Sequence, residues 1–510
     1  MNSVSARLLA IWLVCVAAVT LEPFNFATRA GLGHGLEVFE YGAHGGPIHF
    51  VLNMLLFMPF GVLLHHEARR RSFTLLSIVI VAGMAGISIS MIIEYLQAFL
   101  PGRDSSLIDV LANAAGALVG VAAERRWGTS ARVRLGRVRA ATSTAILVGL
   151  VGSCLVAALL ISGALQAETR LSNWNSEYPL LIGNELTGDR PWRGRVFALD
   201  ITDASTPAAS IHRFSAGESV ALPGAPVAMF AFTGNPPYKD AAGILPDFQW
   251  TERPNLAGQA GVRLSDHSWL KSDRPAAGFA QRLRQTNAFT LHVRLATDDT
   301  NQDGPARIVS NSASPLLRNF TLGQQGSDLV VRWRTPATGV NGYPLEVHVP
   351  GVFADYGTHE ILATYNGASL LVATAHGHYV SSTELTPGAT AALAFPPLQV
   401  RPDELRACEM VYVAFMSSVP AVLIGLLGHT GRQRLALSVA WVLAFAVLLE
   451  ITIVGVSGRS FDWADVAQAV AVGAVVLAAL NTLLSRTDTA WPESAYAHIA
   501  RVDALEIQPG

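Results

Sequence analysis

Long apolar runs at both ends of the chain constrain its fold more than any other feature. A helix that crosses the hydrocarbon core of a bilayer needs about 20 mostly apolar residues, and runs of this kind occur before residue 166 and after residue 408. The residues between them have the mixed polarity of a soluble domain. Charged residues make up 15% of the 510 residues, against about 25% in an ordinary soluble protein. The sequence therefore predicts a membrane protein with a large water-exposed domain.

The apolar runs give a candidate for each membrane span. They cover residues 8–21, 48–64, 73–93, 107–123, 143–165, 410–428, 435–456 and 464–484. The first run is short, so it could also be a secretory signal peptide cleaved near Ala17 and Ala18. A path of eight spans agrees better with the positions of the charged residues, and we therefore expect a retained helix.

Arginines orient the predicted spans. Basic residues stay on the cytoplasmic side of short loops, and the arginines at 69–71, 125–139 and 432–434 fall on one side of an eight-span path. We expect both termini in the cytoplasm and the middle domain outside. The predicted parts are a four-helix bundle (1–125), a basic cytoplasmic linker (126–142), a fifth span (143–165), an extracytoplasmic domain (166–405), three C-terminal spans (406–486) and a cytoplasmic tail (487–510).

The charge argues against a nucleic-acid-binding protein, and the cysteine content argues against a soluble domain held together by disulfides. The formal net charge of -2 does not suit a general nucleic-acid binder, and the clustered arginines are explained by membrane topology. Cys15 and Cys154 fall inside apolar runs and Cys408 borders one, so the soluble region has no cysteines to form an internal disulfide. The cysteines also show no metal-binding spacing.

Polar residues recur inside the first four spans. They form the pattern Asn53-x3-Phe57-x-Pro59-x-Gly61, Glu94-x2-Gln97, Arg103, Asp109-x3-Asn113 and Gly116-x3-Gly120. Over about residues 10–125 this pattern resembles the VanZ-like family of bacterial membrane proteins. The resemblance implies a small helical bundle in a bacterial plasma (inner) membrane and a link to glycopeptide-antibiotic resistance, but no established reaction. The two glycines of the last motif also permit close approach of helices within the bundle.

Two interpretations of the polar residues remain open. Glu94 ends one apolar run, Arg103 lies in the outer loop and Asp109 begins the next run. Charged groups near hydrocarbon are costly unless paired, so Arg103 could bridge the two acids and clip the helix ends together. Alternatively, a polar pocket opens to the outer face, in which the planar guanidinium binds a phosphate or carboxylate. The candidate ligand-binding residues are Asn53, Glu94, Gln97, Arg103, Asp109 and Asn113; none is predicted to be catalytic.

The C-terminal spans contain a degenerate copy of this hairpin. Glu450, Arg459 and Asp465 follow one another at the same offsets of nine and six residues. Ala469 stands where Asn113 would be and Val472 replaces Gly116. We expect this copy to keep the fold and to have lost any binding role.

The middle domain is predicted to be an all-β sandwich or jelly roll. Short alternating segments at 288–295, 306–310, 320–333 and 359–373 indicate strands, and Asn366-Gly367 is a strong hairpin signal. The segment at about 285–385 resembles concanavalin A-like, LamG-type lectin and glucanase domains. Residues 182–196 look like the closing strands of that fold yet come first, so we expect either a rearranged strand order or a separate hairpin around Trp192.

The resemblance implies carbohydrate recognition by this domain. The Glu-x-Asp-x-x-Glu motif that glucanases of this type carry does not occur, so we expect binding rather than hydrolysis. The tryptophans Trp174, Trp192, Trp250, Trp269 and Trp333 and Tyr343 could stack on sugars or belong to the core.

One loop of the middle domain is a candidate calcium site. Asp299-x-Asn301-x-Asp303-Gly304 resembles the opening of a calcium loop, in which alternating oxygens converge on the cation. The position of the closing acid is Ser310, so a polar turn between two strands is the favoured interpretation and calcium binding is the alternative. We expect no other cofactor.

Together these features predict a multi-pass α-helical membrane protein of about eight spans with an inserted extracytoplasmic β-sandwich. Its partners are the lipid bilayer and an envelope glycan or lipid-linked precursor, with no nucleic acid. The leading hypothesis is a non-enzymatic binding protein. The alternative is a transporter or enzyme that acts on lipid-linked envelope precursors.

Overall fold

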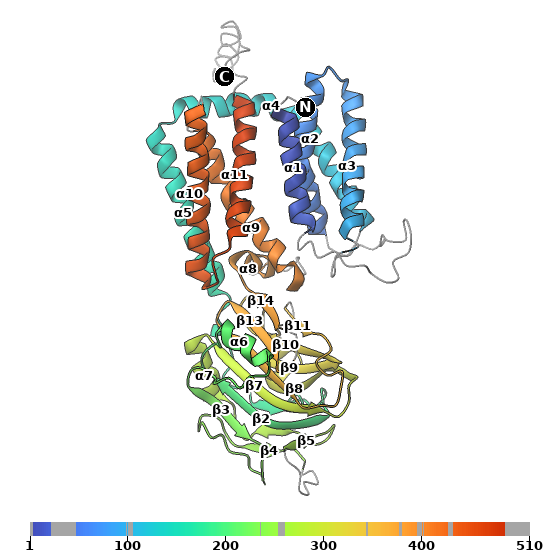
Figure 1. Cartoon of the computed structure of the whole chain (residues 1–510), viewed down its shortest axis with the longest axis vertical. Helices are drawn as coiled ribbons and strands as arrows, with labels where there is room; N and C mark the ends of the chain where they lie inside the picture. The colour runs from blue at the N-terminus through green and yellow to red at the C-terminus, as the bar shows by residue number, and fades with distance from the viewer. Residues whose placement is uncertain are drawn as a thin grey trace, which may run out of the picture. The chain divides into compact units, whose positions relative to one another are not determined.

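A computed structural model of the chain is shown in Figure 1. The structure describes residues 4–21, 47–97, 99, 106–234, 236–252, 261–342, 345–376, 380–394, 400, 402–426 and 432–484. The chain forms two compact units. One comprises Met1–Leu159, Met410–Thr452 and Phe461–Gly510, and the other Leu160–Glu409 with Ile453–Ser460.

Long helices occupy the positions of all the predicted spans. Within the described ranges they are α1 (Val4–Leu21), α2 (Pro47–Arg70), α3 (Leu75–Gln97), α4 (Leu107–Ala141), α5 (Thr144–Ala167), α9 (Leu405–Leu426), α10 (Arg432–Ser457) and α11 (Trp463–Leu484). Among the residues that the structure covers, 6 helices, α3, α4, α5, α9, α10 and α11, are long and apolar enough to cross a membrane. A membrane protein is therefore confirmed, while the count of eight spans stays a prediction.

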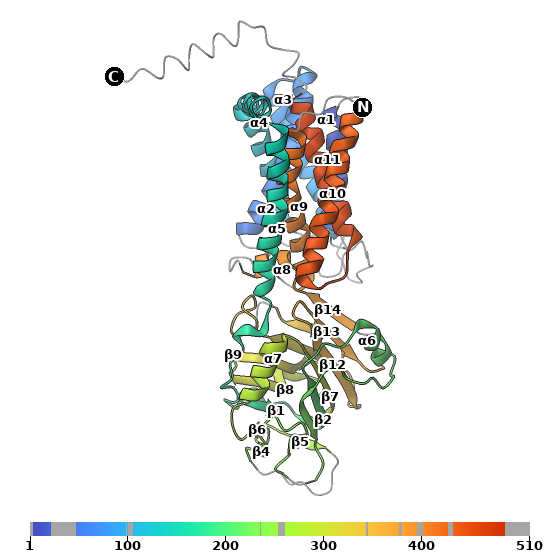
Figure 2. The ribbon, with the colours of Figure 1, turned by 90° about the vertical axis from the view of Figure 1, so that its left-hand side faces the viewer.

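Helix α4 is longer than the predicted span. It has 35 residues and continues through most of the segment that we expected to be a basic linker. In both views its last part runs across the direction of the other long helices of its unit (Figures 1 and 2). Arginine and alanine, which are frequent in this segment, are good helix formers, and this explains the continuation.

Glycines allow α2 and α4 to pack closely. A Cβ atom at Gly116 would overlap the carbonyl oxygen of Met54, and one at Gly120 would overlap that of Met58. Gly61 on α2 meets the carbonyl oxygen of Ala117 in the same way. The Gly116-x3-Gly120 motif therefore packs within the bundle, as predicted.

Helix α1 packs into this bundle. The buried ring of Trp12 stacks on Phe60 and meets Phe57 edge-on, each with ring centroids 5.1 Å apart. Its indole N–H donates to the carbonyl oxygen of Leu56 at 3.2 Å. These contacts favour a retained helix over a cleaved signal peptide.

The middle of the chain forms two antiparallel sheets. Its strands are β1 (Leu180–Ile182), β2 (Gly194–Thr202), β3 (Pro226–Ala231), β4 (Phe248–Trp250), β5 (Val262–Leu264), β6 (Leu270–Ser272), β7 (Phe289–Thr297), β8 (Gln302–Ser314), β9 (Leu317–Gly326), β10 (Asp328–Trp333), β11 (Val347–Val349), β12 (His359–Tyr365), β13 (Ser369–Thr374) and β14 (Val380–Glu384). In the described residues the first sheet has the order β11-β10-β9-β8-β1-β6-β4. The second has the order β14-β13-β12-β7-β2-β3, with β5 paired to β2.

Side chains from both sheets form one hydrophobic core. Ile308, Leu322 and Val331 of the first sheet and Leu199 and Val293 of the second belong to it. The sandwich also carries the helices α6 (Ala208–Ser215), α7 (Ala277–Thr286) and α8 (Pro387–Leu393). These helices were not predicted from the sequence. Two packed antiparallel sheets are thus established, and the finer assignment to a jelly roll or a concanavalin A-like fold stays a prediction.

The predicted hairpin at Asn366-Gly367 is present. It joins β12 to β13, and the Asn366 side-chain oxygen accepts hydrogen bonds from the amides of Ala368 and Ser369 at 2.9 and 2.7 Å. Gly367 has a φ of 92°, which glycine adopts without strain. Asparagine and glycine therefore each have a defined role in this turn.

Residues 182–196 run from the first sheet to the second, and a strand order rearranged from the concanavalin A-like fold stays a prediction. β1 pairs with β8 and β6 in the first sheet, and β2 pairs with β7 and β3 in the second. The segment around Trp192 connects the two sheets and does not form a separate hairpin, and the Trp192 side chain is fully buried.

Candidate functional site

A buried carboxylate joins α3 to α4. Glu94 near the end of α3 is 4% exposed, and its Oε2 accepts a hydrogen bond from the Ser106 amide at 2.9 Å. Ser106 caps α4, because its hydroxyl accepts from the amide of Ile108 at 3.2 Å. Glu94 therefore fixes the start of α4 against the end of α3.

Amide side chains extend this polar cluster. The Asn113 side-chain nitrogen on α4 donates to the Ser90 hydroxyl on α3 at 2.8 Å, and both residues are buried. The Asn113 amide oxygen is buried and has no hydrogen-bond partner among the described residues. Gln97 donates to the Thr20 carbonyl oxygen of α1 at 2.9 Å. The cluster thus connects α1, α3 and α4.

The remaining predicted residues are only partly placed. Asp109 lies half-buried in the first turn of α4. Asn53 is half-buried on α2 and precedes Met54, the residue against which Gly116 of α4 packs. Arg103 lies outside the described residues, so its bridge between Glu94 and Asp109 stays a prediction.

The second hairpin repeats the central hydrogen bond. Oε1 of buried Glu450 accepts from the Asp462 amide at 2.7 Å, across the same sequence separation of 12 residues as in the first hairpin. The Asp462 carboxylate in turn accepts from the Ala464 amide at 2.8 Å, at the start of α11. Asp465 is buried, and Arg459 lies in the connection between α10 and α11. This shared capping geometry supports the hypothesis of an internal repeat.

The two hairpins differ where the first has its amide cluster. By sequence position, Ala446 and Ala469 replace Ser90 and Asn113. Ala446 and Ala469 border a void of about 10 Å³ that is lined mostly by apolar side chains. The second hairpin thus retains the capping carboxylate without this part of the polar cluster.

The β domain contains a cleft that was not predicted from the sequence. It has a volume of about 470 Å³ and lies over the second sheet beside α6. The cleft is lined by Phe214, Gly217, Glu218, Ser219, Val220, Leu222, His292, Arg294, Thr358, Glu360, Leu362, Ala375 and His376. It is therefore part polar and part apolar.

Ionisable side chains on neighbouring strands meet at this cleft, where His292, Arg294 and Glu360 belong to the lining and Asp200 lies beside it. His292 Nδ1 lies 3.7 Å from an Asp200 carboxylate oxygen, and its Nε2 lies 3.5 Å from a Glu360 oxygen. Arg294 is the register partner of Glu360 and covers the Phe197 ring at 5.5 Å from its centroid. Alternation within β7 turns Leu291, Val293 and Leu295 toward the core, so His292 and Arg294 face outward. That alternation was the available sequence signal.

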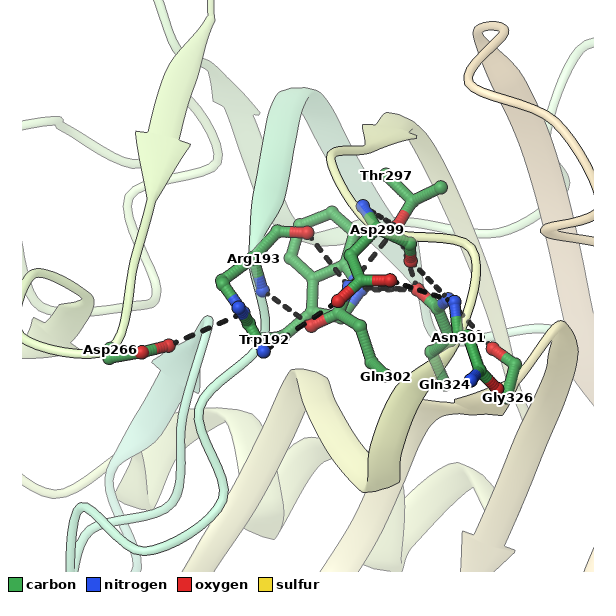
Figure 3. Close-up of polar contacts among 9 residues, drawn as sticks. All are labelled: Trp192, Arg193, Asp266, Thr297, Asp299, Asn301, Gln302, Gln324 and Gly326. Carbon is green, nitrogen blue, oxygen red and sulfur yellow. Dashed lines mark hydrogen bonds and ion pairs between the residues drawn. The ribbon is translucent and has the colours of Figure 1, made fainter.

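The candidate calcium loop is a network of hydrogen bonds (Figure 3). Asp299 Oδ1 accepts from the Asn301 amide at 2.9 Å, and Oδ2 lies 3.6 Å from Arg193 Nη2. The Asp299 carbonyl oxygen accepts from Thr297 Oγ1 and Gln324 Nε2, each at 2.8 Å. Arg193 thus supplies positive charge at Asp299.

The other two predicted calcium ligands, Asn301 and Asp303, are more exposed than Asp299. Asn301 and Asp303 are exposed and flank the buried Gln302. Within the described ranges no three His, Cys, Asp or Glu side chains form a group that could hold a metal. The calcium site, whose predicted ligands include an asparagine, stays a prediction.

Most of the candidate sugar-stacking aromatics are core residues. Trp174, Trp192 and Trp333 are buried, and Trp192 Nε1 donates to Gln324 Oε1 at 2.8 Å. Trp250 and Trp269 are partly buried against the same core. Tyr343 lies outside the described residues.

The helices and sheets define a membrane protein with a β domain inserted between α5 and α9. Residues 4–126, which contain α1, α2, α3 and the first part of α4, match the VanZ/LLP1 family model. The match confirms the resemblance for this part of the chain. No curated protein and no solved structure is significantly similar to the chain.

Proposed function

We propose that this is a bacterial envelope protein whose β domain binds a glycan or a glycan-bearing partner outside the plasma membrane. The cleft over the second sheet is the observation that carries the proposal. Its volume of about 470 Å³ lies in the usual range of about 300–1,000 Å³ for small-molecule sites. In this proposal both termini are cytoplasmic and residues 166–405 are extracytoplasmic.

The cleft offers the two kinds of surface that a sugar needs. Glu218, Glu360 and Arg294 can exchange hydrogen bonds with hydroxyl groups, and Val220 and Leu222 provide apolar surface for C–H groups. Asp200 and Glu360 both contact His292.

The membrane bundle completes the proposal. Glu94, Asn113 and Asn53, together with Arg103, would engage the headgroup of a lipid-linked glycan, and the buried Asn113 oxygen without a described partner offers an acceptor. The same acceptor also supports the alternative of a transporter or enzyme that acts on lipid-linked precursors through Glu94, Arg103 and Asp109. Flux into vesicles that Glu94→Gln abolishes would favour this alternative.

Glycan binding can be tested directly. The full chain in lipid nanodiscs is applied to an array of bacterial envelope glycans and peptidoglycan fragments. We expect a specific signal that Arg294→Gln and Glu360→Gln both weaken at least tenfold. The matched control is Arg274→Gln, whose side chain is 77% exposed and lies outside the cleft. A signal unaffected by the two cleft variants would refute this site.

The proposed orientation and the antibiotic link need separate tests. A reporter fused after Gly163 should be extracytoplasmic, and a cytoplasmic reporter would refute the orientation. Deleting the gene should change susceptibility to a glycopeptide antibiotic if the link implied by the VanZ-like resemblance holds for this chain. An unchanged susceptibility would remove that link without affecting glycan binding.

A further inference from the structure

The first sheet carries three buried arginines on neighbouring strands. Arg307 on β8 is 1% exposed, Arg318 on β9 is fully buried, and Arg332 on β10 is 8% exposed. Arginine is almost never fully buried in proteins unless it is paired. A cluster of three is therefore an arrangement that requires a physical explanation.

Strand geometry places these arginines on the face opposite the core. Arg307 lies between the core residues Ala306 and Ile308, and Arg332 lies between Val331 and Trp333, so alternation turns both away from the core. On β9 a register shift pairs Arg318 with Ser312. Such a bulge changes the direction of a side chain, and it brings Arg318 to the same face.

Two of the arginines have carboxylate partners. Arg307 Nε lies 3.5 Å from Glu185 Oε2, and Arg332 pairs with Glu346. Arg318 differs, because its Nε, Nη1 and Nη2 atoms have no hydrogen-bond partner among the described residues. The cluster of three arginines and two glutamates therefore leaves one buried positive charge uncompensated.

Neighbouring hydroxyl groups do not supply the missing acceptor. Ser310 bonds to Ser312 at 2.6 Å and to Thr321 at 3.2 Å. Ser312 also bonds to Glu185. These hydroxyl groups bond to one another and to Glu185, and none of them bonds to the Arg318 guanidinium.

The electrostatic cost falls on Arg318. Burial, together with the positive charges of Arg307 and Arg332, lowers the pKa of its guanidinium to about 9. The group nevertheless remains charged at neutral pH. A buried charge without a partner is strongly unfavourable, whereas a charge-assisted hydrogen bond to an anion would offset that cost.

We propose that Arg318, flanked by Arg307 and Arg332, binds an anionic group inside the β domain. The ligand carries negative charge and accepts N–H hydrogen bonds, as chloride, a carboxylate or a phosphate does. The site is separate from the cleft, because it is built on the first sheet. It therefore does not depend on the proposed glycan binding.

Anion-dependent stability tests this site. The full chain in nanodiscs is unfolded by heat in a zwitterionic buffer without added salt, and then with chloride, acetate or inorganic phosphate at equal ionic strength. Fluorescence of the chain's tryptophans follows unfolding as a whole, and hydrogen exchange of β8 to β10 reports on the β domain. For the wild type we expect at least one anion to raise Tm by about 5–10 °C at roughly 100 times its Kd.

Variants link the effect to the cluster. Arg318→Met should lose the anion dependence of Tm. Arg318→Lys keeps the charge but not the planar fork, so it should need at least a tenfold higher anion concentration for the same rise in Tm. The exposed Arg274→Gln should respond as the wild type does. If Arg318→Met does not fold, Arg318→Lys decides alone. Equal responses of the wild type and Arg318→Lys, or equal Tm values in all the salts, would overturn the proposal.

The same assay distinguishes a free ion from part of a larger ligand. Glucuronate carries the carboxylate of acetate on a sugar ring. An anion site for a small ion should respond to acetate or chloride at lower concentrations than to glucuronate. The reverse order would identify the anionic group of a larger sugar acid, and either order supports the site.

Discussion

Replacing Glu94 by alanine should lower the free energy of unfolding of the membrane bundle by about 2 kcal/mol. Its carboxylate accepts the Ser106 amide at 2.9 Å, and both residues are at most 5% exposed. Removing the acceptor leaves a buried N–H group unpaired, which costs roughly 1–3 kcal/mol. Glu94→Gln keeps an acceptor oxygen and should lower the free energy of unfolding by only about 1 kcal/mol. It still has a cost, because a hydrogen bond to a charged carboxylate is stronger than one to a neutral amide.

The second hairpin provides the matched control. Glu450 accepts the Asp462 amide at 2.7 Å, so Glu450→Ala should destabilise the protein by a similar amount. Unfolding in mixed micelles with increasing SDS, followed by circular dichroism, measures both variants. If the polar cluster binds a ligand, Glu94→Gln should also weaken binding, while Glu450→Gln should not. A Glu94→Ala variant as stable as the wild type would refute the capping role.

Three further predictions concern packing, pH and calcium. Gly116→Ala should destabilise the bundle by about 1–3 kcal/mol through overlap with the Met54 carbonyl, whereas Gly152→Ala, with nothing within 4 Å of its Cβ, should not. The Tyr365 hydroxyl donates to Thr169 at 2.5 Å, and burial raises its pKa above the ordinary 10.0. The stabilisation by the protonated Tyr365 hydroxyl is thus complete below pH 10 and is lost as the pH rises further. The free energy of unfolding of Tyr365→Phe should lack this decline at alkaline pH. If the Asp299 loop binds calcium, Arg193→Gln should increase the rise in Tm that calcium causes, and an unchanged Tm in both proteins would favour the polar turn.

Local sequence signals predicted the elements whose cause is local. Apolar runs marked the membrane helices, and Asn366-Gly367 marked a hairpin because its backbone conformation depends on those residues alone. The polar residues of the first hairpin were also readable, since Glu94 and Asn113 stand out against an apolar background. Their partners were missed for two reasons: Ser106 lies in the loop just before α4, and Ser90 lies inside an apolar helix, where a serine gives little signal.

Features that depend on distant pairing were not predictable in the same way. The cleft brings together His292 and Glu360 on strands that pair only in the folded sheet. Arg318 looks like an ordinary strand residue, and the bulge that turns it away from the core depends on its pairing with β8. The helical continuation of α4 was missed for another reason, since the arginines were read for their charge rather than for their helix propensity.

The interior positions of β1 and β2 have a consequence for biosynthesis. Both strands are made first, and each has one neighbour, β8 for β1 and β7 for β2, that lies about a hundred residues later in the chain. Because N-terminal segments emerge first during synthesis, β2 can pair early with β3, but one edge of β2 stays open until β7 has been made and one edge of β1 until β8 has been made. A chaperone that shields early apolar strands should therefore increase the yield of this protein.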